Sequence, residues 1–499
     1  MIHSLSLSDV LADHARSRPG ITAVVDGATR LTYPELDARV TRLAGALAGL
    51  GVGGGDRVLW LGQNSHAVLE LLLACSRLGA VCCPANWRQS EDELRFVLAD
   101  LTPSVVVWEP SDTTAALRGS APGTWVRAGD EYERLIADAS PREFPQVADT
   151  EPVLALYTAA FGGRPCAALL ASAALIAHAT SLLVVRQMEP GFTFLNSGPL
   201  YHVGTMMFCL ATFQIGGTNV FTPAFDAEEV CRLVDAERVT QAFLFGPMID
   251  AVTKANADGA YDLSSLRFVA HSAEWDDMIT VDGSPWCRSK MGGYGQTEVG
   301  GMLTFLGLAE GGAGFAGRPN PLVQVRLLAP DGVEVPVGEV GEICARGKTL
   351  FSGYFARPDL NAVKSTYGWH HTGDLGRREL DGTITFIGPK LRMIKSGAEN
   401  IYPAEVERAL RSHPSVADAA VIGVPDPVLH QAVRAVVVLH PGATATGEEL
   451  IGHVKTSLAS YKKPREVVFV DEIPKRGPGP GPDYDALDAA HGGGGYPGR

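Results

Sequence analysis

Apolar residues near the start of the chain recur at helical spacing, and short extended runs follow them. Five recur at intervals of four, three, four and three: Leu36, Val40, Leu43, Leu47 and Leu50. This spacing places them on one helical face, and Thr32 with Glu35 forms a capping-box pattern at the start of that helix. Residues 56–61 and 80–83 are predicted strands on either side of a helical segment at 67–78. Alternation at this pitch predicts an α/β sheet with helices packed on it.

The middle of the chain predicts more strands and one apolar helix. Residues 153–158 form a short apolar run typical of a strand, and residues 159–165 are a predicted loop. The Ala- and Leu-rich segment 166–179 predicts a buried helix that is too short to span a bilayer. Segments 243–247 and 268–273 predict short parallel strands.

The pattern becomes β-rich between residues 317 and 355. Residues 323–327 and 340–345 alternate between apolar and polar positions, and Asp331-Gly332 marks a hairpin turn between them. These strands predict a small distorted β-barrel that closes the large N-terminal region of mixed sheets and flanking helices.

The last hundred residues predict a compact α/β unit followed by a Gly- and Pro-rich tail. The expected order is helix, strand, strand, helix and strand, at 403–412, 416–424, 432–439, 447–459 and 466–470. Gly and Pro dominate 477–482 and Gly fills 492–495, which predicts a loop and a flexible tail. The fold class expected for the whole chain is α/β, or α+β overall.

Composition and charge exclude several classes of protein. The chain has 499 residues, which is too long for one compact core and predicts two or more domains. Hydrophobic residues make up 46% and charged residues 20%, as in ordinary globular proteins. The net charge is −14 and there is no block of Lys or Arg, so nucleic acid is not an expected partner.

The cysteines and the N-terminus point to a cytoplasmic protein. The eight cysteines show no spacing typical of a metal site, and Cys82-Cys83 lies in an apolar run. Buried free thiols in a reducing compartment are therefore expected. Residues 1–20 lack a basic region followed by an apolar core, so no signal peptide is expected. No apolar run is long enough for a transmembrane helix.

The stretch Gly293 to Glu298 (GYGQTE) carries the first candidate chemistry. Glycine lets a backbone approach a ligand closely because it has no Cβ. The Thr297 hydroxyl can hydrogen-bond a phosphate oxygen, and the Glu298 carboxylate is a hard oxygen ligand suited to Mg²⁺. Tyr294 offers a flat apolar face for a base. A glycine-rich turn with two solvated polar residues would give the same local pattern.

Three further stretches follow in a fixed order. They are Trp369 to Leu375 (WHHTGDL), Lys395 to Glu407 (KSGAENIYPAEVE) and Tyr461 to Pro464 (YKKP). Together with GYGQTE they resemble the adenylate-forming superfamily of acyl- and aryl-CoA synthetases, peptide-synthetase adenylation domains and luciferases. The resemblance extends from about Leu5 to Lys475. It implies an N-terminal AMP-binding domain over 1–388 and a small mobile C-terminal domain over 389–499, with a hinge at Leu391.

The resemblance also assigns roles to matching residues. It implies a catalytic pair, Thr297 on phosphate and Glu298 on Mg²⁺. It places the acyl and CoA pocket at His202, Gly397 and Ala398. The implied nucleotide-binding residues are Thr158, Gly163, Arg164, His271, Ser272, Ala273, Tyr294, Gly295, Gln296 and Asp374. Among these, Asp374 resembles the carboxylate that accepts both ribose hydroxyls, as an acceptor-only group can.

The chain departs from the family pattern at three cationic positions. Cys166 stands where relatives carry the lysine of the phosphate loop, Pro389 replaces an arginine, and Pro480 replaces the C-terminal catalytic lysine. Positioned cations stabilise the charge that builds on the phosphates, and losing one costs about 10²–10³ in rate. Arg164 and Lys475 are nearby cations that could substitute.

The resemblance implies ATP-dependent activation of a carboxylic acid, with ATP, Mg²⁺ and CoA as cofactors. Three readings stay open from the sequence. One is a divergent carboxylate–CoA ligase, for instance for a fatty acid. The second is an adenylate-forming enzyme with another acid or acceptor, such as a diazotase-like member that uses nitrite and an aryl amine. The third is a non-catalytic nucleotide- or acyl-CoA-binding protein. The acid and the oligomeric state, a homodimer included, stay open as well.

Overall fold

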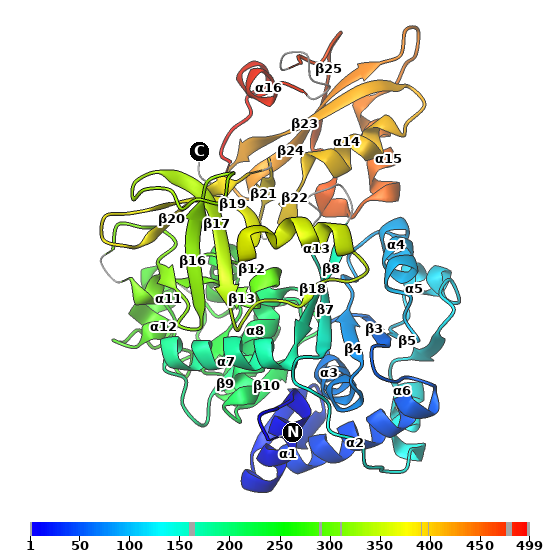
Figure 1. The fold of residues 1–499 in the computed structure, drawn as a ribbon, viewed down its shortest axis with the longest axis vertical. Helices are drawn as coiled ribbons and strands as arrows, with labels where there is room; N and C mark the ends of the chain where they lie inside the picture. The colour runs from blue at the N-terminus through cyan, green and yellow to red at the C-terminus, as the bar shows by residue number, and fades with distance from the viewer. Residues whose placement is uncertain are drawn as a thin grey trace.

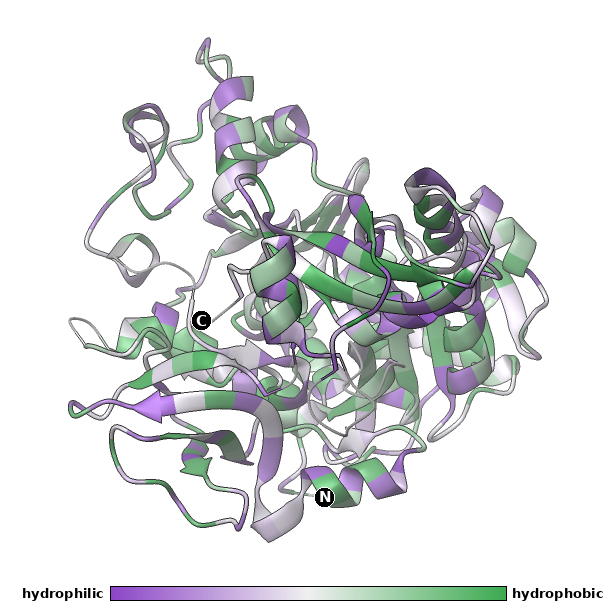
Figure 2. Ribbon diagram, turned by 90° about the horizontal axis from the view of Figure 1, so that it is seen from above, coloured by the Kyte–Doolittle hydropathy of each residue, from purple (hydrophilic) through white to green (hydrophobic). Residues whose placement is uncertain are grey.

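A computed structural model describes residues 2–158, 165–288, 292–309, 312–390, 392–397, 399–475 and 482–496. It shows a large N-terminal region of several sheets with helices around them and a smaller C-terminal region stacked on one end of it (Figure 1). Seen from above, the strands near the centre are mostly hydrophobic, whereas the surrounding helices mix hydrophilic and hydrophobic residues (Figure 2). The expected α/β architecture is confirmed. None of the helices within these ranges is long and apolar enough to cross a membrane.

Two sheets organise the first half of the chain. One has the order β18-β8-β7-β4-β3-β5-β6, with bounds Gly353–Tyr354, Cys166–Ala171, Pro152–Thr158, Val81–Pro84, Arg57–Leu61, Val105–Trp108 and Thr124–Arg127. The other has the order β11-β9-β10-β1-β2, with bounds Gln241–Ala242, Thr193–Asn196, Thr218–Phe221, Thr22–Asp26 and Thr29–Thr32. Its first four strands are parallel, as are β7, β4, β3, β5 and β6 in the other sheet.

Helices cover these sheets and complete the core. They are α1 (Leu7–Ser17), α2 (Tyr33–Gly49), α3 (His66–Leu78), α4 (Glu91–Leu101), α5 (Asp112–Leu117), α6 (Asp130–Asp138), α7 (Ser172–Arg186), α8 (Val203–Gln214), α9 (Ala227–Glu237), α10 (Gly246–Ala255), α11 (Ala273–Met278) and α12 (Pro285–Arg288). The predicted capping box is confirmed at α2, where Thr32 N donates to Glu35 Oε2 at 2.7 Å and Glu35 N to Thr32 Oγ1 at 3.4 Å. The apolar face of α2 is fully buried against α1, α3 and the strands.

The helix predicted over 166–179 is wrong in its first half. Residues Cys166–Ala171 form strand β8, which pairs antiparallel with β7 in a register that sets Thr158 opposite Cys166. The helix α7 begins only at Ser172. Alanine favours helix weakly, by a few tenths of a kcal/mol over most residues, and pairing with two neighbouring strands outweighs that preference. Residues 158 and 166 thus become direct neighbours.

The two strands predicted near 243–247 and 268–273 are also displaced. Strand β11 ends at Ala242, and α10 begins at Gly246 with Pro247 in its first turn, where a missing N–H is tolerated. At the second segment a single bridge joins Arg267 to Thr280, and α11 begins at Ala273. Ser272 is its N-cap and accepts from Trp275 N at 3.2 Å.

The β-rich stretch forms an antiparallel sheet of order β16-β17-β19-β20, with bounds Val323–Leu328, Val340–Gly347, His370–Arg378 and Ile384–Pro389. The predicted turn is present: Gly332 has a φ of 84°, and Val333 N donates to Asp331 Oδ1 at 3.1 Å. Helix α13 (Pro358–Lys364) connects β18 to this sheet. Short hairpin strands precede it, namely β12 (Gly295–Gln296), β13 (Gly301–Met302), β14 (Thr304–Phe305) and β15 (Arg318–Pro319).

The C-terminal elements follow the predicted order. They are β21 (Ile394–Ser396), β22 (Glu399–Ile401), α14 (Pro403–Arg411), β23 (Val416–Asp426), β24 (His430–Leu439), α15 (Gly447–Ser457) and β25 (Glu466–Phe469). The predicted flexible tail at 492–495 is wrong. Helix α16 (Tyr484–His491) precedes it, and Tyr496 after it is buried, with its hydroxyl 2.8 Å from Gly423 N and 3.0 Å from Asp488 Oδ1. An aromatic anchor therefore fixes a segment whose glycine content suggested disorder.

A buried ion-pair triad joins the C-terminal region to the large region. The Lys462 ammonium lies 2.7 Å from Glu93 Oε1 on α4 and 2.9 Å from Glu405 Oε2 on α14. Ala459 N also donates to Glu93 Oε2 at 2.7 Å. Burial alone lowers the pKa of Lys462, but the carboxylates outweigh it and the pKa is raised. The triad holds α4 against α14 and α15.

Lys462→Met is expected to lower the free energy of unfolding by about 3–5 kcal/mol, because two buried carboxylates lose their cation. Urea denaturation followed by circular dichroism measures this loss. Lys463→Met is the matched control, since the Lys463 ammonium lies 3.3 Å from the Ser460 hydroxyl at an exposed position. Equal stability of the two variants would show that the triad does not stabilise this arrangement.

Candidate functional site

The GYGQTE stretch lies in a tight hairpin. Gly295 and Gln296 form β12, Thr297–Val299 form a 3₁₀ turn, and β13 returns antiparallel. A Cβ at Gly295 would collide with the carbonyl oxygen of Gly301, and one at Gly293 with that of Thr304. Glycine is therefore required for backbone packing at both positions. The sequence alone could not tell this structural requirement from a role in binding a ligand.

Tyr294, Gln296 and Asp374, three of the residues predicted to bind the nucleotide, lie together. The Tyr294 hydroxyl donates to Asp374 Oδ2 at 2.6 Å, and Gln296 Nε2 lies 3.3 Å from the same oxygen. Gln296 Oε1 lies 3.2 Å from His370 Nε2. One face of the Tyr294 ring stacks on Phe386, with centroids 5.3 Å apart and an 18° interplanar angle. Only the opposite face of that ring could meet a base.

The Asp374 carboxylate has an unusual ionisation. Burial raises its pKa to about 6, although hydrogen bonds from Tyr294 and Gln296 and the charge of Lys364 oppose the rise. It lies on β19, directly after Gly373, whose N–H donates to Glu342 Oε1 at 3.0 Å. Above that pH the group is an acceptor-only carboxylate held in a fixed orientation, which suits a ligand that presents hydroxyl donors.

Glu298 lies in the interior of the same site. It is buried, and its Oε1 accepts from the Tyr354 hydroxyl at 2.8 Å. Burial raises its pKa, and hydrogen bonds from Tyr354 and Thr158 oppose the rise. Thr158, at the end of β7, also donates to Cys166 O at 3.4 Å. The structure thus brings Thr158 and Glu298 together, and a single carboxylate with hydroxyls around it fits Mg²⁺, which keeps several of its waters.

Arg357 is a cation that sequence reasoning missed. Strand β18 pairs with β8, and Phe355 N continues the pairing with a 2.9 Å bond to Ala167 O, which carries Arg357 to the start of β8. Its guanidinium forms an ion pair with Asp100, whose Oδ2 accepts from the Tyr157 hydroxyl at 2.9 Å. Burial raises the pKa of the Cys166 thiol, and the charge and hydrogen bond of Arg357 oppose the rise.

Lys364 is a second cation that the sequence did not single out. Its ammonium, at the end of α13, donates to His371 O at 3.0 Å. Burial lowers its pKa, and the charges of Glu298, Glu342 and Asp374 oppose the fall. Strand pairing brings Arg357 to this site and helix α13 brings Lys364, so no linear motif could have revealed them.

The segment predicted to run along adenine is held by its own contacts. His271 Nε2 lies 2.7 Å from Asp250 Oδ1, and His271 N donates to Asp276 Oδ1 at 2.9 Å. Ser272 and Ala273 start α11. These contacts fix the backbone of the segment. That the segment runs along adenine stays a prediction.

His202 and Gly397 lie on neighbouring parts of the two regions. His202 is the N-cap of α8, and its Nδ1 accepts from Gly204 N at 3.0 Å. Gly397 has a φ of 60° in the turn between β21 and β22, and its N–H donates to Leu429 O at 2.8 Å. Arg88 fastens this hairpin to the large region through Glu399 at 2.8 Å. Gly163, Arg164, Leu391, Ala398 and Pro480 lie outside the described residues.

A groove of about 290 Å³ separates α4 from α14. Its lining comes from both regions: Asp92, Glu93, Phe96, Pro165, Glu405, Arg408, Ala409, Ser412, Ser457 and Leu458. Pro165, which directly precedes strand β8, is one of these lining residues.

Comparison with known proteins identifies the family. The family model described as AMP-binding enzyme matches residues 11–355, and the one described as AMP-binding enzyme C-terminal domain matches residues 405–479. A feruloyl-CoA synthase from Amycolatopsis sp is 39% identical over 475 residues, covering 93% of this chain and 95% of the relative. An indoleacetate–CoA ligase from Aromatoleum aromaticum is 34% identical over 495 residues, covering 94% and 95%.

A solved structure agrees with the sequence comparison. The amide bond synthetase McbA from Marinactinospora thermotolerans superposes with a TM-score of 0.80 at 26% identity, covering 98% of this chain and all of the other. The motifs, the fold and these matches agree. The chain belongs to the AMP-binding enzyme family, and it is an adenylate-forming enzyme similar to acyl-CoA and aryl-CoA ligases.

Proposed function

We propose that the chain joins an aromatic carboxylic acid to CoA at the expense of ATP. In the first step a carboxylate oxygen attacks the α-phosphorus of ATP, the bond to pyrophosphate breaks, and an acyl-adenylate forms. In the second step the CoA sulfur attacks the acyl carbon, AMP leaves, and the thiol proton passes to solvent. The observation that carries the proposal is the Asp374 carboxylate, oriented by Tyr294 and Gln296 in a chain of this family.

Asp374 is proposed to accept the ribose hydroxyls of ATP. Tyr294 and Gln296 hold Oδ2 by hydrogen bonds of 2.6 and 3.3 Å, so the carboxylate needs little reorganisation to bind. Preorganisation of this kind lowers the entropic cost of binding. Hydrogen bonds to a charged acceptor are worth about 1.5–3 kcal/mol each, so Asp374 would contribute substantially to nucleotide affinity.

Glu298 and Thr297 are proposed to serve the phosphates. Mg²⁺, when bound, neutralises charge on the phosphate oxygens. Glu298 would hold it by the carboxylate that Tyr354 and Thr158 orient. Thr297 follows β12 in the same hairpin, and its hydroxyl would donate to a phosphate oxygen.

Arg357 is proposed to supply the positive charge that Cys166 cannot. Its guanidinium is held by Asp100 beside the start of β8, and arginine suits phosphate because its donors match two oxygens at once. Lys364 contributes a second positive charge on the side of Asp374. Neither cation lies at a position where relatives carry the missing lysines. The two together would therefore replace the lost positive charge beside the phosphates from different positions in the chain.

The two relatives reported above support an aromatic acid, because both act on aromatic acids according to their names. Pyrophosphate release is therefore expected to be more than about tenfold faster with hydroxycinnamates or arylacetates than with straight-chain fatty acids, a discrimination of the size that a few apolar contacts supply. A coupled pyrophosphate assay over a panel of acids, with and without CoA, measures this.

Omission of ATP is the control for the panel. Faster release with fatty acids would contradict the proposal that the acid is aromatic. The proposal that the chain is a CoA ligase would still stand. If none of the acids in the panel gives a CoA thioester, while an aryl acid and an amine give an amide, CoA as the acceptor is contradicted.

A further inference from the structure

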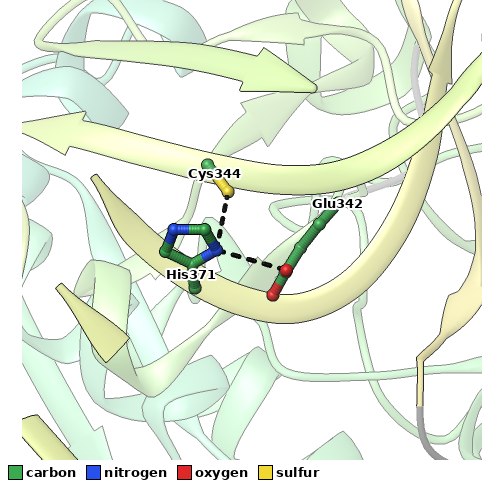
Figure 3. Close-up of side chains that lie close together, drawn as sticks. All are labelled: Glu342, Cys344 and His371. Carbon is green, nitrogen blue, oxygen red and sulfur yellow. Dashed lines mark hydrogen bonds and ion pairs between the residues drawn. The ribbon is translucent and has the colours of Figure 1, made fainter. Parts of the chain in front are cut away.

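Three metal-binding side chains meet beside the site, although no linear motif predicts them (Figure 3). Strands β17 and β19 pair antiparallel with Cys344 opposite His371. Glu342 is two positions before Cys344 on β17. Figure 3 shows all three side chains pointing toward one another from the two strands. His371 Nδ1 lies 3.2 Å from Glu342 Oε2 and 3.4 Å from Cys344 Sγ, and the three donor atoms all lie within 4.8 Å of one another.

Outer contacts orient two of these groups as ligands. His371 Nε2 lies 3.2 Å from Thr366 O, a carbonyl that can only accept, so Nε2 carries a proton there. Without an ion, Nδ1–H donates to Glu342 Oε2; with an ion bound, the Nδ1 lone pair of the Nε2-protonated tautomer would point at it, between the thiol and the carboxylate. Gly373 N–H holds the other carboxylate oxygen, Glu342 Oε1, at 3.0 Å. A backbone partner on the far side of each ligand is the arrangement that metal sites use to fix ligand orientation.

We propose that Glu342, Cys344 and His371 bind one thiophilic divalent cation of the Zn²⁺ type. Thiolate, imidazole and carboxylate are the ligands that Zn²⁺ takes, at about 2.3, 2.0–2.1 and 2.0–2.2 Å. A tetrahedral ion at those distances needs neighbouring ligand atoms roughly 3.3–3.6 Å apart. The two separations from His371 Nδ1, 3.2 and 3.4 Å, differ from this range by a few tenths of an ångström at most, and the Glu342 and Cys344 ligand atoms lie within 4.8 Å of each other. A water would occupy the fourth position.

Lys390 is the internal competitor of such a cation. Its ammonium lies 3.1 Å from Glu342 Oε2, the same oxygen that would bind the ion. Its side chain is 53% exposed, so it can turn to solvent when the ion enters. The Cys344 thiol proton leaves to solvent at the same time, since thiolate is the ligand. Because Glu342 also holds Gly373, the bound ion would brace the strand that carries Asp374.

Titration of the whole metal-free chain with Co²⁺ tests this site without any enzyme assay. We expect one equivalent to give a sulfur-to-cobalt charge-transfer band and the intense visible bands of a four-coordinate ion, and Zn²⁺ to displace them. Cys344→Ser is expected to abolish the charge-transfer band, and His371→Gln to weaken binding by more than about tenfold. Lys390→Met is expected to tighten binding, because it removes the competing charge.

Cys287→Ser is the matched control, because its thiol bonds a backbone carbonyl at 3.3 Å, Thr280 O, and lies outside the cluster. It should leave the bands unchanged. The absence of a charge-transfer band in the unaltered chain, or its persistence in Cys344→Ser, would overturn the proposal. If Cys344→Ser fails to fold, unchanged or weaker affinity in Lys390→Met overturns it instead.

Discussion

Replacing Asp374 by alanine is expected to weaken ATP and AMP binding by about 10²-fold or more, because two hydrogen bonds to a charged acceptor are lost. The Tyr294 hydroxyl and the Gln296 amide would lose their shared partner as well. Isothermal titration calorimetry with AMP measures the change directly, independently of turnover. Unchanged affinity would show that the ribose binds elsewhere.

The ionisation of Asp374 adds a signature that a purely structural role would lack. Because burial raises its pKa to about 6, the carboxylate is ionised above that pH and protonated below it. Ribose hydroxyls favour the ionised acceptor, so AMP affinity should fall by about tenfold per pH unit as the pH drops below 6. Asp374→Asn keeps the shape without this titration, so its lower affinity should fall less steeply over the same range, where only the AMP phosphate (pKa about 6) still takes up a proton. A parallel slope in both proteins would contradict the assignment.

Arg357→Ala is expected to slow pyrophosphate release by about 10²–10³, the loss typical of one preorganised donor in a charged transition state. The reason is the position of the guanidinium beside Cys166, where it is held by Asp100. Arg357→Lys keeps the charge without the two-pronged geometry and should retain part of the rate. The measurement is the turnover rate at saturating ATP and acid.

The chain itself offers a rescue experiment for this cation. If Arg357 supplies the charge that Cys166 cannot, then Cys166→Lys should restore much of the rate in the Arg357→Ala background. Arg95→Ala is the matched control, because Arg95 pairs with Glu91 on the exposed side of α4. Equal rates in Arg357→Ala and Arg95→Ala would remove Arg357 from the proposed machinery.

Local patterns predicted much of the fold because the elements they describe are set by nearby residues. The helix α2 has a capping box and one apolar face, and the C-terminal elements alternate clearly, so each could be predicted by its own spacing. Segment 166–171 could not, because alanine and leucine fit a helix or a buried strand, and only pairing with β7 and β18 decides between them. Tyr496 shows the same limit, since the hydrogen bonds of its hydroxyl to Gly423 N and Asp488 Oδ1 hold the end of a glycine-rich tail.

The candidate site divides along the same line. Tyr294, Gln296, Glu298 and Asp374 stand in recognisable motifs, and the structure brings Tyr294 and Gln296 onto Asp374. Arg357 and the Glu342–Cys344–His371 cluster depend on which strands pair and in what register. The side chains that meet there come from separate segments of the chain, so their spacing in the sequence does not predict the contact. For this reason the spacing of the cysteines along the sequence does not indicate a metal site, although Cys344 lies beside Glu342 and His371.

One isotope experiment tests adenylate formation most directly. An aromatic acid whose carboxylate carries a heavy oxygen isotope is incubated with the chain, ATP, Mg²⁺ and CoA, and the AMP is examined by mass spectrometry. Formation of an acyl-adenylate followed by thioester formation predicts one labelled oxygen in AMP for each thioester made. Thioester with unlabelled AMP, or labelled inorganic phosphate in place of labelled AMP, would contradict the proposed reaction.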